Sequence, residues 1–238
     1  MDAFPIKETL IIAIILCVVS SAFPFSKPSS TVQVSFTKIE SRVSSIDTVK
    51  GIIHSFDGRV VIAAAYPICQ VMLIDSLTTL IYNKEERTAV QIRRNVRSVL
   101  PFYQTFIGFL CGEPAVPVMQ CKIDRSSKRG DTLITSWVAR DKKTGFEGKI
   151  ETAYWKDRPV SASSIDKKGR VLSHMVFSND TMVNGKHMPL RIVTRTLQGA
   201  DTFCEDVSFS SLLIGMPVPD SIKNIAIPPD IPVKVLEW

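Results

Sequence analysis

The sequence has few of the residues that build enzyme active sites and metal centres. It contains only three histidines, and none stands at metal-ligand spacing from another histidine or from a cysteine. GxSxG elbows, HExxH pairs and phosphate-cradling glycine loops are absent. We therefore expect a protein without catalytic activity, metal or cofactor. An enzyme that uses His174 or His187 is the weakest alternative.

A hydrophobic run long enough to cross a membrane is also missing. The longest apolar segment is Leu10–Val19, which follows Lys7, whereas a transmembrane helix needs about 20 apolar residues. Small residues come next, at Ser20-Ser21-Ala22, where a signal peptidase cleaves. The pattern predicts a cleaved signal peptide over residues 1–22, export to the periplasm, and a single domain over 23–238. A retained membrane anchor is the alternative.

Cysteines are few and show neither CxxC nor metal-ligand spacing. Export to an oxidising compartment permits disulfides, and Cys111 and Cys121 bracket a proline-rich loop that a disulfide would close. Burial as free thiols is the equal alternative, because Cys69 and Cys204 lie within strand-like segments. The sequence leaves the pairing of these four cysteines open.

The charge is moderately basic, with a formal net charge of +6. Basic residues are scattered along the predicted strands and are not interleaved with aromatic residues, which disfavours nucleic acid as a partner. An excess of lysine and arginine suits acidic partners such as phospholipid headgroups, and it also serves as plain solubilising charge.

Short segments rich in Val, Ile, Leu and Tyr dominate the chain and are separated by turn residues such as Asp57-Gly58 and Asn184-Gly185. This texture predicts antiparallel strands. The expected strands are Thr48–His54, Arg59–Ala65, Ile68–Asp75, Thr79–Asn83, Thr88–Arg93, Thr132–Arg140, Gly148–Trp155, Val160–Ile165, Val171–Ser178, Met188–Leu197 and Asp201–Phe209.

Two segments have helical periodicity. In Val32–Ile46, apolar residues recur at three- and four-residue intervals, which predicts a short amphipathic helix. In Ser98–Leu110, the same spacing produces a strongly aromatic stripe, and Gly112 and Pro114 end the segment. The proline-rich tail from Pro217 onward is expected to form an extended strap.

These elements predict an α+β, mainly β, fold. So many strands in one domain of this size favour a strongly curved antiparallel half-barrel of about 10–11 strands, with an N-terminal helix and a lid helix over an apolar cavity. Two interpretations of the surplus of apolar residues remain open. They fill an ordinary core, or they line a hollow that accepts a hydrophobic ligand.

The order of motifs is similar to that of a known family. Val71-Met72-Leu73-Ile74-Asp75 followed by Leu80-Ile81-Tyr82-Asn83 resembles the paired strands of the LolA-type outer-membrane lipoprotein carriers. Asn184–Pro189 and the late Phe203–Leu213, closed by Pro217-Val218-Pro219-Asp220, resemble the final hairpin and the proline-containing end of that superfamily. The resemblance spans roughly residues 45–238.

The resemblance implies a carrier that hides the acyl chains of lipoproteins or lipids in an apolar cavity. Such carriers load from an inner-membrane ABC transporter, cross the periplasm and deliver to an outer-membrane acceptor, with transient membrane contact. The alternative is an envelope interaction module or a lipid-sensing regulator without a carrier role. The expected cavity or lid residues are Val71, Leu73, Tyr82, Phe102, Phe106, Phe109, Met175 and Phe177.

Overall fold

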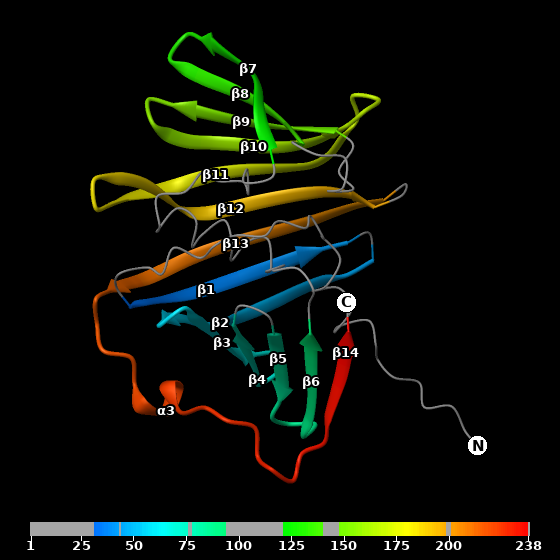
Figure 1. Ribbon diagram of the computed structural model, residues 1–238, viewed down its shortest axis with the longest axis vertical. Coiled ribbons are helices and arrows are strands. Elements are labelled where there is room, and N and C mark those ends of the chain that lie inside the picture. Colours follow the sequence, from blue (N-terminus) through cyan, green and yellow to red (C-terminus); the bar gives the residue numbers. More distant parts are fainter. Residues whose placement is uncertain are drawn as a thin grey trace, which may run out of the picture.

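The computed structural model describes residues 31–42, 44–75, 78–93, 121–139, 148–198 and 201–237. Nearly all of these residues belong to one sheet of fourteen strands (Figure 1). The strands are β1 (Val32–Ser41), β2 (Ile46–Phe56), β3 (Arg59–Tyr66), β4 (Gln70–Ile74), β5 (Thr78–Asn83), β6 (Thr88–Arg93), β7 (Cys121–Arg129), β8 (Thr132–Ala139), β9 (Gly148–Trp155), β10 (Arg158–Asp166), β11 (Val171–Val183), β12 (Lys186–Gln198), β13 (Asp201–Ile214) and β14 (Val233–Glu237).

The sheet consists of two antiparallel meanders that meet in the middle. Strands β1 to β6 follow one another on one side, and β7 to β13 do so on the other. The two halves join where β1 pairs with β13, seen as the blue and orange strands in Figure 1. The last strand, β14, pairs with β6 in parallel orientation and forms one edge, while β7 forms the other.

All eleven strands expected from the sequence are present, which confirms the mainly β fold. The residues at the turns explain why the sequence predicts these hairpins correctly. Asp57-Gly58 and Asn184-Gly185 both have two consecutive residues with positive φ, the conformation of tight two-residue hairpin turns.

The predicted N-terminal helix over Val32–Ile46 is wrong, because Val32–Ser41 forms strand β1. Val32, Val34 and Phe36 are buried at every second position, the period of a strand with one covered face. Lys38 and Glu40 continue this buried series, so charged residues interrupt the apolar alternation. Because of this interruption, the three- and four-residue spacing of the apolar residues was more conspicuous than the two-residue spacing of a strand.

Two further strands were not expected. Strand β7 is exposed from its second residue onward and carries mostly polar and charged side chains, as suits an edge strand. Strand β14 lies in the tail that was expected to be an extended strap; this tail also contains the four-residue helix α3 (Asp220–Lys223). The predicted lid helix Ser98–Leu110 and the signal peptide lie outside the described residues.

The two faces of the sheet carry two separate apolar clusters. The larger cluster includes Val34, Phe36, Ile53, Met72 and Phe209 and extends over strands of both halves. We call the face that carries it the inner face. The smaller cluster joins Phe56, Val61 and Val71 to Val218 of the C-terminal tail, with Leu73, Ile222 and Ile225 packed against it. We call this second side, which the tail covers, the outer face.

Candidate functional site

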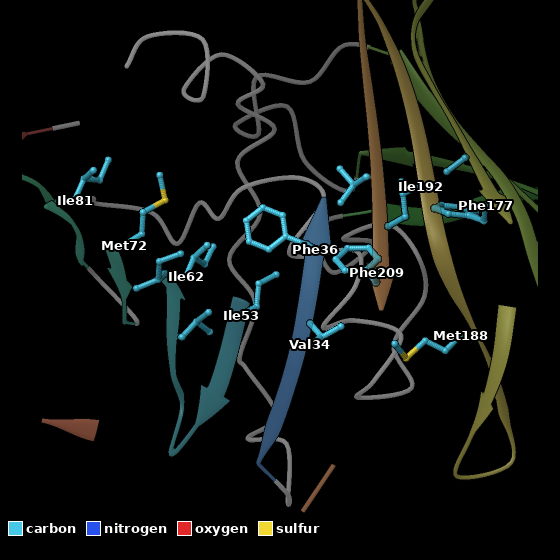
Figure 2. Close-up of a cluster of buried hydrophobic side chains, with 14 of the residues drawn as sticks. Val34, Phe36, Ile53, Ile62, Met72, Ile81, Phe177, Met188, Ile192 and Phe209 are labelled. Carbon is cyan, nitrogen blue, oxygen red and sulfur yellow. The ribbon is translucent and has the colours of Figure 1, made fainter. Parts of the chain in front are cut away.

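The inner face carries the larger of the two buried apolar clusters that the described residues form. Figure 2 shows ten labelled side chains of its cluster, which come from β1 to β5 and from β11 to β13. Ile53, Met188, Ile192, Val34 and Val207 are among the most deeply buried side chains. Their cross-strand pairing makes the cluster continuous across the β1–β13 junction, because Phe36 lies directly opposite Phe209.

Gly51 makes room for an aromatic ring on this face. It lies opposite Phe36 in the β1–β2 ladder. A Cβ atom at Gly51 would lie 2.9 Å from Cε1 of Phe36 and 2.3 Å from the carbonyl oxygen of Ala63, and both approaches are too close for a side chain. Glycine at this position therefore allows β2 to pass beneath the Phe36 ring.

A buried charged cluster bounds the apolar surface along β1 and β13. Lys38 Nζ donates a hydrogen bond to Glu40 Oε1 at 2.5 Å, and it lies 3.9 Å from Glu205 Oε2. Burial raises the pKa of Glu205 to about 7, because Lys38 only partly offsets the loss of hydration and Glu40 adds to the rise. The inner face therefore changes from apolar to charged within a few residues of Phe36.

One buried hydroxyl on the inner face lacks a partner. Thr79 lies opposite Ile74 and Ile92, two members of the apolar cluster. Within the described part of the chain, its Oγ1 atom is buried and makes no hydrogen bond. Such a group costs about 1–3 kcal/mol relative to a satisfied one. A ligand with a polar group among its apolar atoms would remove that cost.

The predicted cavity residues fall on both faces of the sheet. Phe177 belongs to the inner cluster and Met175 packs against it. Val71 and Leu73 belong to the outer cluster, and Tyr82 shares their face because it pairs with Val71. Phe102, Phe106 and Phe109 lie outside the described residues.

Strand β4 shows why the sequence could not assign these faces. Its residues are apolar on both sides because both sides are covered: Met72 and Ile74 pack on the inner face, while Val71 and Leu73 lie beneath the C-terminal tail. A strand that is apolar throughout has no alternation to reveal its orientation. Met72, which the sequence also suggested as part of an adaptable lining, packs on the inner face, and Ile74 and Ile81 are its neighbours there that the sequence did not single out.

A hollow lies on the outer face. It has a volume of about 170 Å³ and is lined by residues of β2 to β6 and of the tail, among them Leu73, Leu80, Ile222 and Ile225. This volume is close to that of cavities that hold a benzene-sized group and below the 300–1,000 Å³ typical of ligand pockets. We therefore take the inner face as the principal candidate site.

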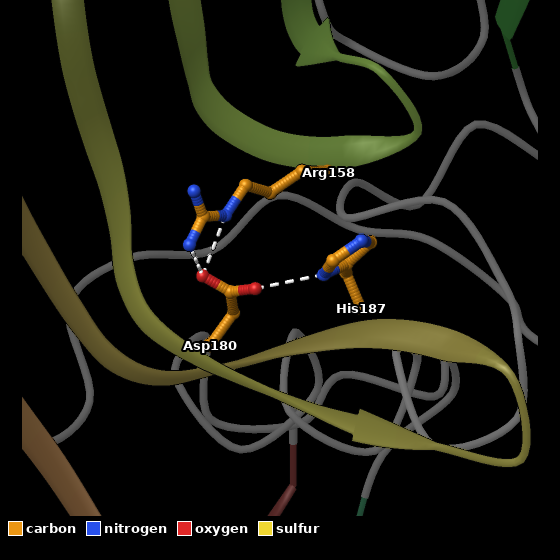
Figure 3. A network of polar contacts seen from close by, with 3 residues as sticks. All are labelled: Arg158, Asp180 and His187. Carbon is orange, nitrogen blue, oxygen red and sulfur yellow. Dashed lines mark hydrogen bonds and ion pairs between the residues drawn. The ribbon is translucent and has the colours of Figure 1, made fainter.

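The histidines do not assemble a catalytic triad within the described strands. His174 Nδ1 lies 2.8 Å from Ser163 Oγ, whereas the carboxylate of Asp180 contacts a different histidine, His187, at 2.7 Å. A serine–histidine–aspartate mechanism needs both contacts on one imidazole. Arg158 also binds Asp180 (Figure 3), so this carboxylate joins strands as an ion pair.

The described residues show neither a metal-binding cluster nor a membrane-spanning helix. They contain no group of three or more His, Cys, Asp or Glu side chains placed to hold a metal ion. Within the same residues, no helix has the length and apolarity needed to span a membrane. Cys69 and Cys204 are half-buried free thiols. Cys111 lies outside the described residues, so a disulfide between Cys111 and Cys121 stays one of the open pairings.

Neither a family model nor a curated protein matches this sequence, but solved structures share its architecture. A LolA superfamily protein from Nitrosomonas europaea has a TM-score of 0.55 at 15% identity, covering 84% of this chain and 91% of its own. A domain from Vibrio parahaemolyticus, ascribed to outer membrane lipoprotein sorting, has a TM-score of 0.55 at 13% identity, covering 82% and 89%. The chain has the LolA fold.

A further structure supports this assignment of the fold. A DUF1329 family protein from Desulfovibrio piger has a TM-score of 0.57 at 13% identity, and the match covers 81% of this chain and 89% of that protein. The resemblance that the sequence motifs suggested is confirmed at the level of the fold. Since one fold hosts many functions, function must be argued from the site.

Proposed function

We propose that this protein is an exported, non-enzymatic carrier that holds the acyl chains of a lipoprotein or lipid against the inner face of the sheet. The proposal places it in the periplasm, where it would load from an inner-membrane ABC transporter and deliver to an outer-membrane acceptor. Support comes from the LolA fold and from the signal-like segment at residues 1–22.

The continuous apolar cluster on the inner face carries this proposal. Val34, Phe36, Met72, Ile192 and Phe209 belong to one cluster that crosses the junction of the two meanders. Each buried methylene is worth about 0.8 kcal/mol, so a chain of sixteen carbons gains on the order of 10 kcal/mol before the costs of binding. Met72, Met175 and Met188 suit such a lining because methionine adapts to ligands of varied shape.

The polar groups of the inner face fit an acylated ligand. The cluster of Lys38, Glu40 and Glu205 bounds the apolar cluster and offers charged partners to the polar end of such a ligand. We place the acyl chain across the apolar cluster, with its polar end toward this charged boundary. Phe102, Phe106 and Phe109 keep their proposed role in a lid over the bound chain.

Native mass spectrometry of protein purified without detergent tests the proposal. We expect a lipid or lipoprotein mass to co-purify, and we expect the bound lipid to move to acceptor vesicles. A protein that stays empty and excludes hydrophobic dyes would instead support an envelope interaction module. A protein that binds lipid and never releases it would support a lipid sensor.

A matched pair of variants on β11 locates the site. Met175 packs on the inner cluster, while its neighbour Val176 points to the opposite face and is 40% exposed. We expect Met175→Asp to reduce lipid uptake at least about tenfold, because a carboxylate in an apolar site is poorly solvated. Val176→Asp is expected to keep uptake, with circular dichroism checking the fold of both. Equal uptake by the two variants would remove the inner face from the proposal.

A further inference from the structure

Three neighbouring hairpins end along one side of the sheet. The turns of β7–β8, β9–β10 and β11–β12 lie next to each other at the left of Figure 1. Strands β7 to β12 are neighbours and antiparallel. Every second turn between them therefore lies at the same ends of the strands. We call the residues at these turns, 128–133, 155–158 and 182–187, the hairpin tips.

Polar contacts join the hairpin tips to one another. Lys156 donates its backbone N–H to the carbonyl oxygen of Asp131 at 3.4 Å, and its Nζ atom lies 3.4 Å from Asp131 Oδ2. Arg158 and His187 both bind the carboxylate of Asp180 (Figure 3). Burial raises the pKa of Asp180, but these two hydrogen bonds outweigh it and hold the pKa below its usual range. The three turns are thus cross-linked into one surface.

Large apolar side chains are exposed at each of the three turns. Leu133 is 46% exposed, Trp155 41% and Met182 56%. Lys156 lies over the Trp155 ring, with its Nζ atom 5.0 Å from the ring centroid. A tryptophan with an exposed ring beside a lysine suits a membrane–water interface, where the ring sits at headgroup level.

Unpaired cations surround these apolar side chains. Lys128, Arg129 and Lys186 are exposed and have no partner among the described residues. Two nearby acids, Asp131 and Asp180, are already paired with Lys156 and Arg158. With the exposed Asp157 counted as well, the hairpin tips and Asp180 carry five lysine and arginine side chains against three carboxylates, so they keep a net positive charge.

We propose that the hairpin tips are a docking surface for an anionic phospholipid bilayer. Exposed Leu, Trp and Met side chains enter the headgroup region, and the surrounding lysines and arginine bind lipid phosphates. This inference goes beyond the proposed function and stands without it, since it involves neither the inner face nor an acyl ligand.

The register of the strands also fixes the orientation of docking. Trp155 pairs with Thr132, and Leu133 is the next residue along β8. Because successive side chains of a strand point to opposite faces, Trp155 and Leu133 lie on different faces of the sheet. A bilayer can contact both side chains only when the ends of the strands face it, with the three turns closest to the membrane. The two faces then stay clear of the membrane surface.

Vesicle co-flotation of the full chain tests the electrostatic part. Vesicles of phosphatidylcholine alone are compared with vesicles containing phosphatidylglycerol, at low and high salt. We expect binding to the anionic vesicles that salt weakens. Lys128→Glu with Arg129→Glu should weaken it at least about 30-fold, since each basic residue near the surface contributes about fivefold and the two new carboxylates add repulsion. The matched control, Lys50→Glu with Lys84→Glu, changes two exposed lysines far along the sheet and should bind as the parent does.

Tryptophan quenching tests the apolar part. Brominated acyl chains are expected to quench a component of the fluorescence that Trp155→Phe removes. Lys128→Glu with Arg129→Glu should abolish this quenching, whereas Tyr66→Ser, which removes an aromatic ring 56% exposed at the end of β3, should leave it unchanged. Because the assay needs no acyl ligand, failure of lipid uptake in the carrier test would not affect it.

Three results would overturn the inference. The first is equal binding of the parent and the hairpin-tip variants to anionic vesicles. The second is equal loss in the Lys50 and Lys84 control. The third is concentration-dependent self-association without lipid that the hairpin-tip variants abolish, since this would assign the surface to a second copy of the chain.

Discussion

The fold strongly alters the ionisation of Glu205. Its carboxyl group lies next to Lys38 and Glu40 on the inner face, and burial raises its pKa to about 7. Between pH 4.5 and about pH 7, the carboxyl group of Glu205 therefore stays protonated in the folded protein, whereas it has lost its proton in the unfolded chain. Stability from this group is complete below the unfolded value of 4.5 and is lost as the pH rises toward about 7.

We expect Glu205→Gln to remove this dependence on pH. Relative to the parent, the variant should gain up to about 3 kcal/mol in free energy of unfolding between pH 5 and pH 8, since each pKa unit corresponds to about 1.4 kcal/mol. Urea unfolding at the two pH values measures the difference. Glu86→Gln, in the exposed turn between β5 and β6, is the control. Parallel profiles for parent and Glu205→Gln would contradict the placement of this carboxyl group.

His54 contributes a pH dependence of stability that is opposite to that of Glu205. It is buried on the outer face opposite Val61, its Nδ1 atom has no partner within the described residues, and burial lowers its pKa from 6.5. The unfolded chain then binds the proton more readily, so stability is present above about pH 6.5 and is lost as the pH falls. His54→Leu should make unfolding less sensitive to acid between pH 7 and pH 5, as urea titrations would show. A variant as acid-sensitive as the parent would refute this.

At the scale of elements, the C-terminal tail is held chiefly by apolar contacts. Val218 is buried against Phe56, Val61 and Val71, whereas the ion pair between Arg87 and Asp230 is exposed on both sides. Exposed ion pairs contribute about 0–1 kcal/mol. The tail reaches the far edge of the sheet, where β14 pairs in parallel with β6.

We therefore expect Val218→Ala to destabilise the protein by about 2 kcal/mol, because it leaves a void in a covered cluster. Arg87→Ala should change stability by less than about 0.5 kcal/mol. Chemical denaturation measures both values. If Arg87→Ala were the more damaging change, the ion pair and not the buried valine would hold the tail.

The individual strands show where sequence patterns predict the fold correctly and where they do not. The eleven predicted strands are present because local composition and turn residues such as Asn184-Gly185 specify them. Strand β1 was missed because Lys38 and Glu40 occupy buried positions, which only the neighbouring Glu205 explains. Strand β7 was missed because an edge strand needs no apolar face.

At the scale of the whole molecule, the pairing of β1 with β13 decides what the protein can do. It joins the two meanders into one sheet, so that Phe36 meets Phe209 and the inner cluster becomes a single surface. It also brings Lys38 and Glu205 together from residues far apart in the sequence. The acyl-binding proposal rests on this junction, and the docking proposal rests on the turns of strands β7 to β12.

The sequence by itself determined eleven of the fourteen strands, their turns and the resemblance to the LolA fold, because these depend on composition and on residues close together in the chain. It placed Met175 and Phe177 on the apolar surface, but it could not separate Met72 from Val71. Only the tertiary structure decided that, since the face of a strand that is apolar on both sides is fixed by register with its neighbours and by the tail that covers it.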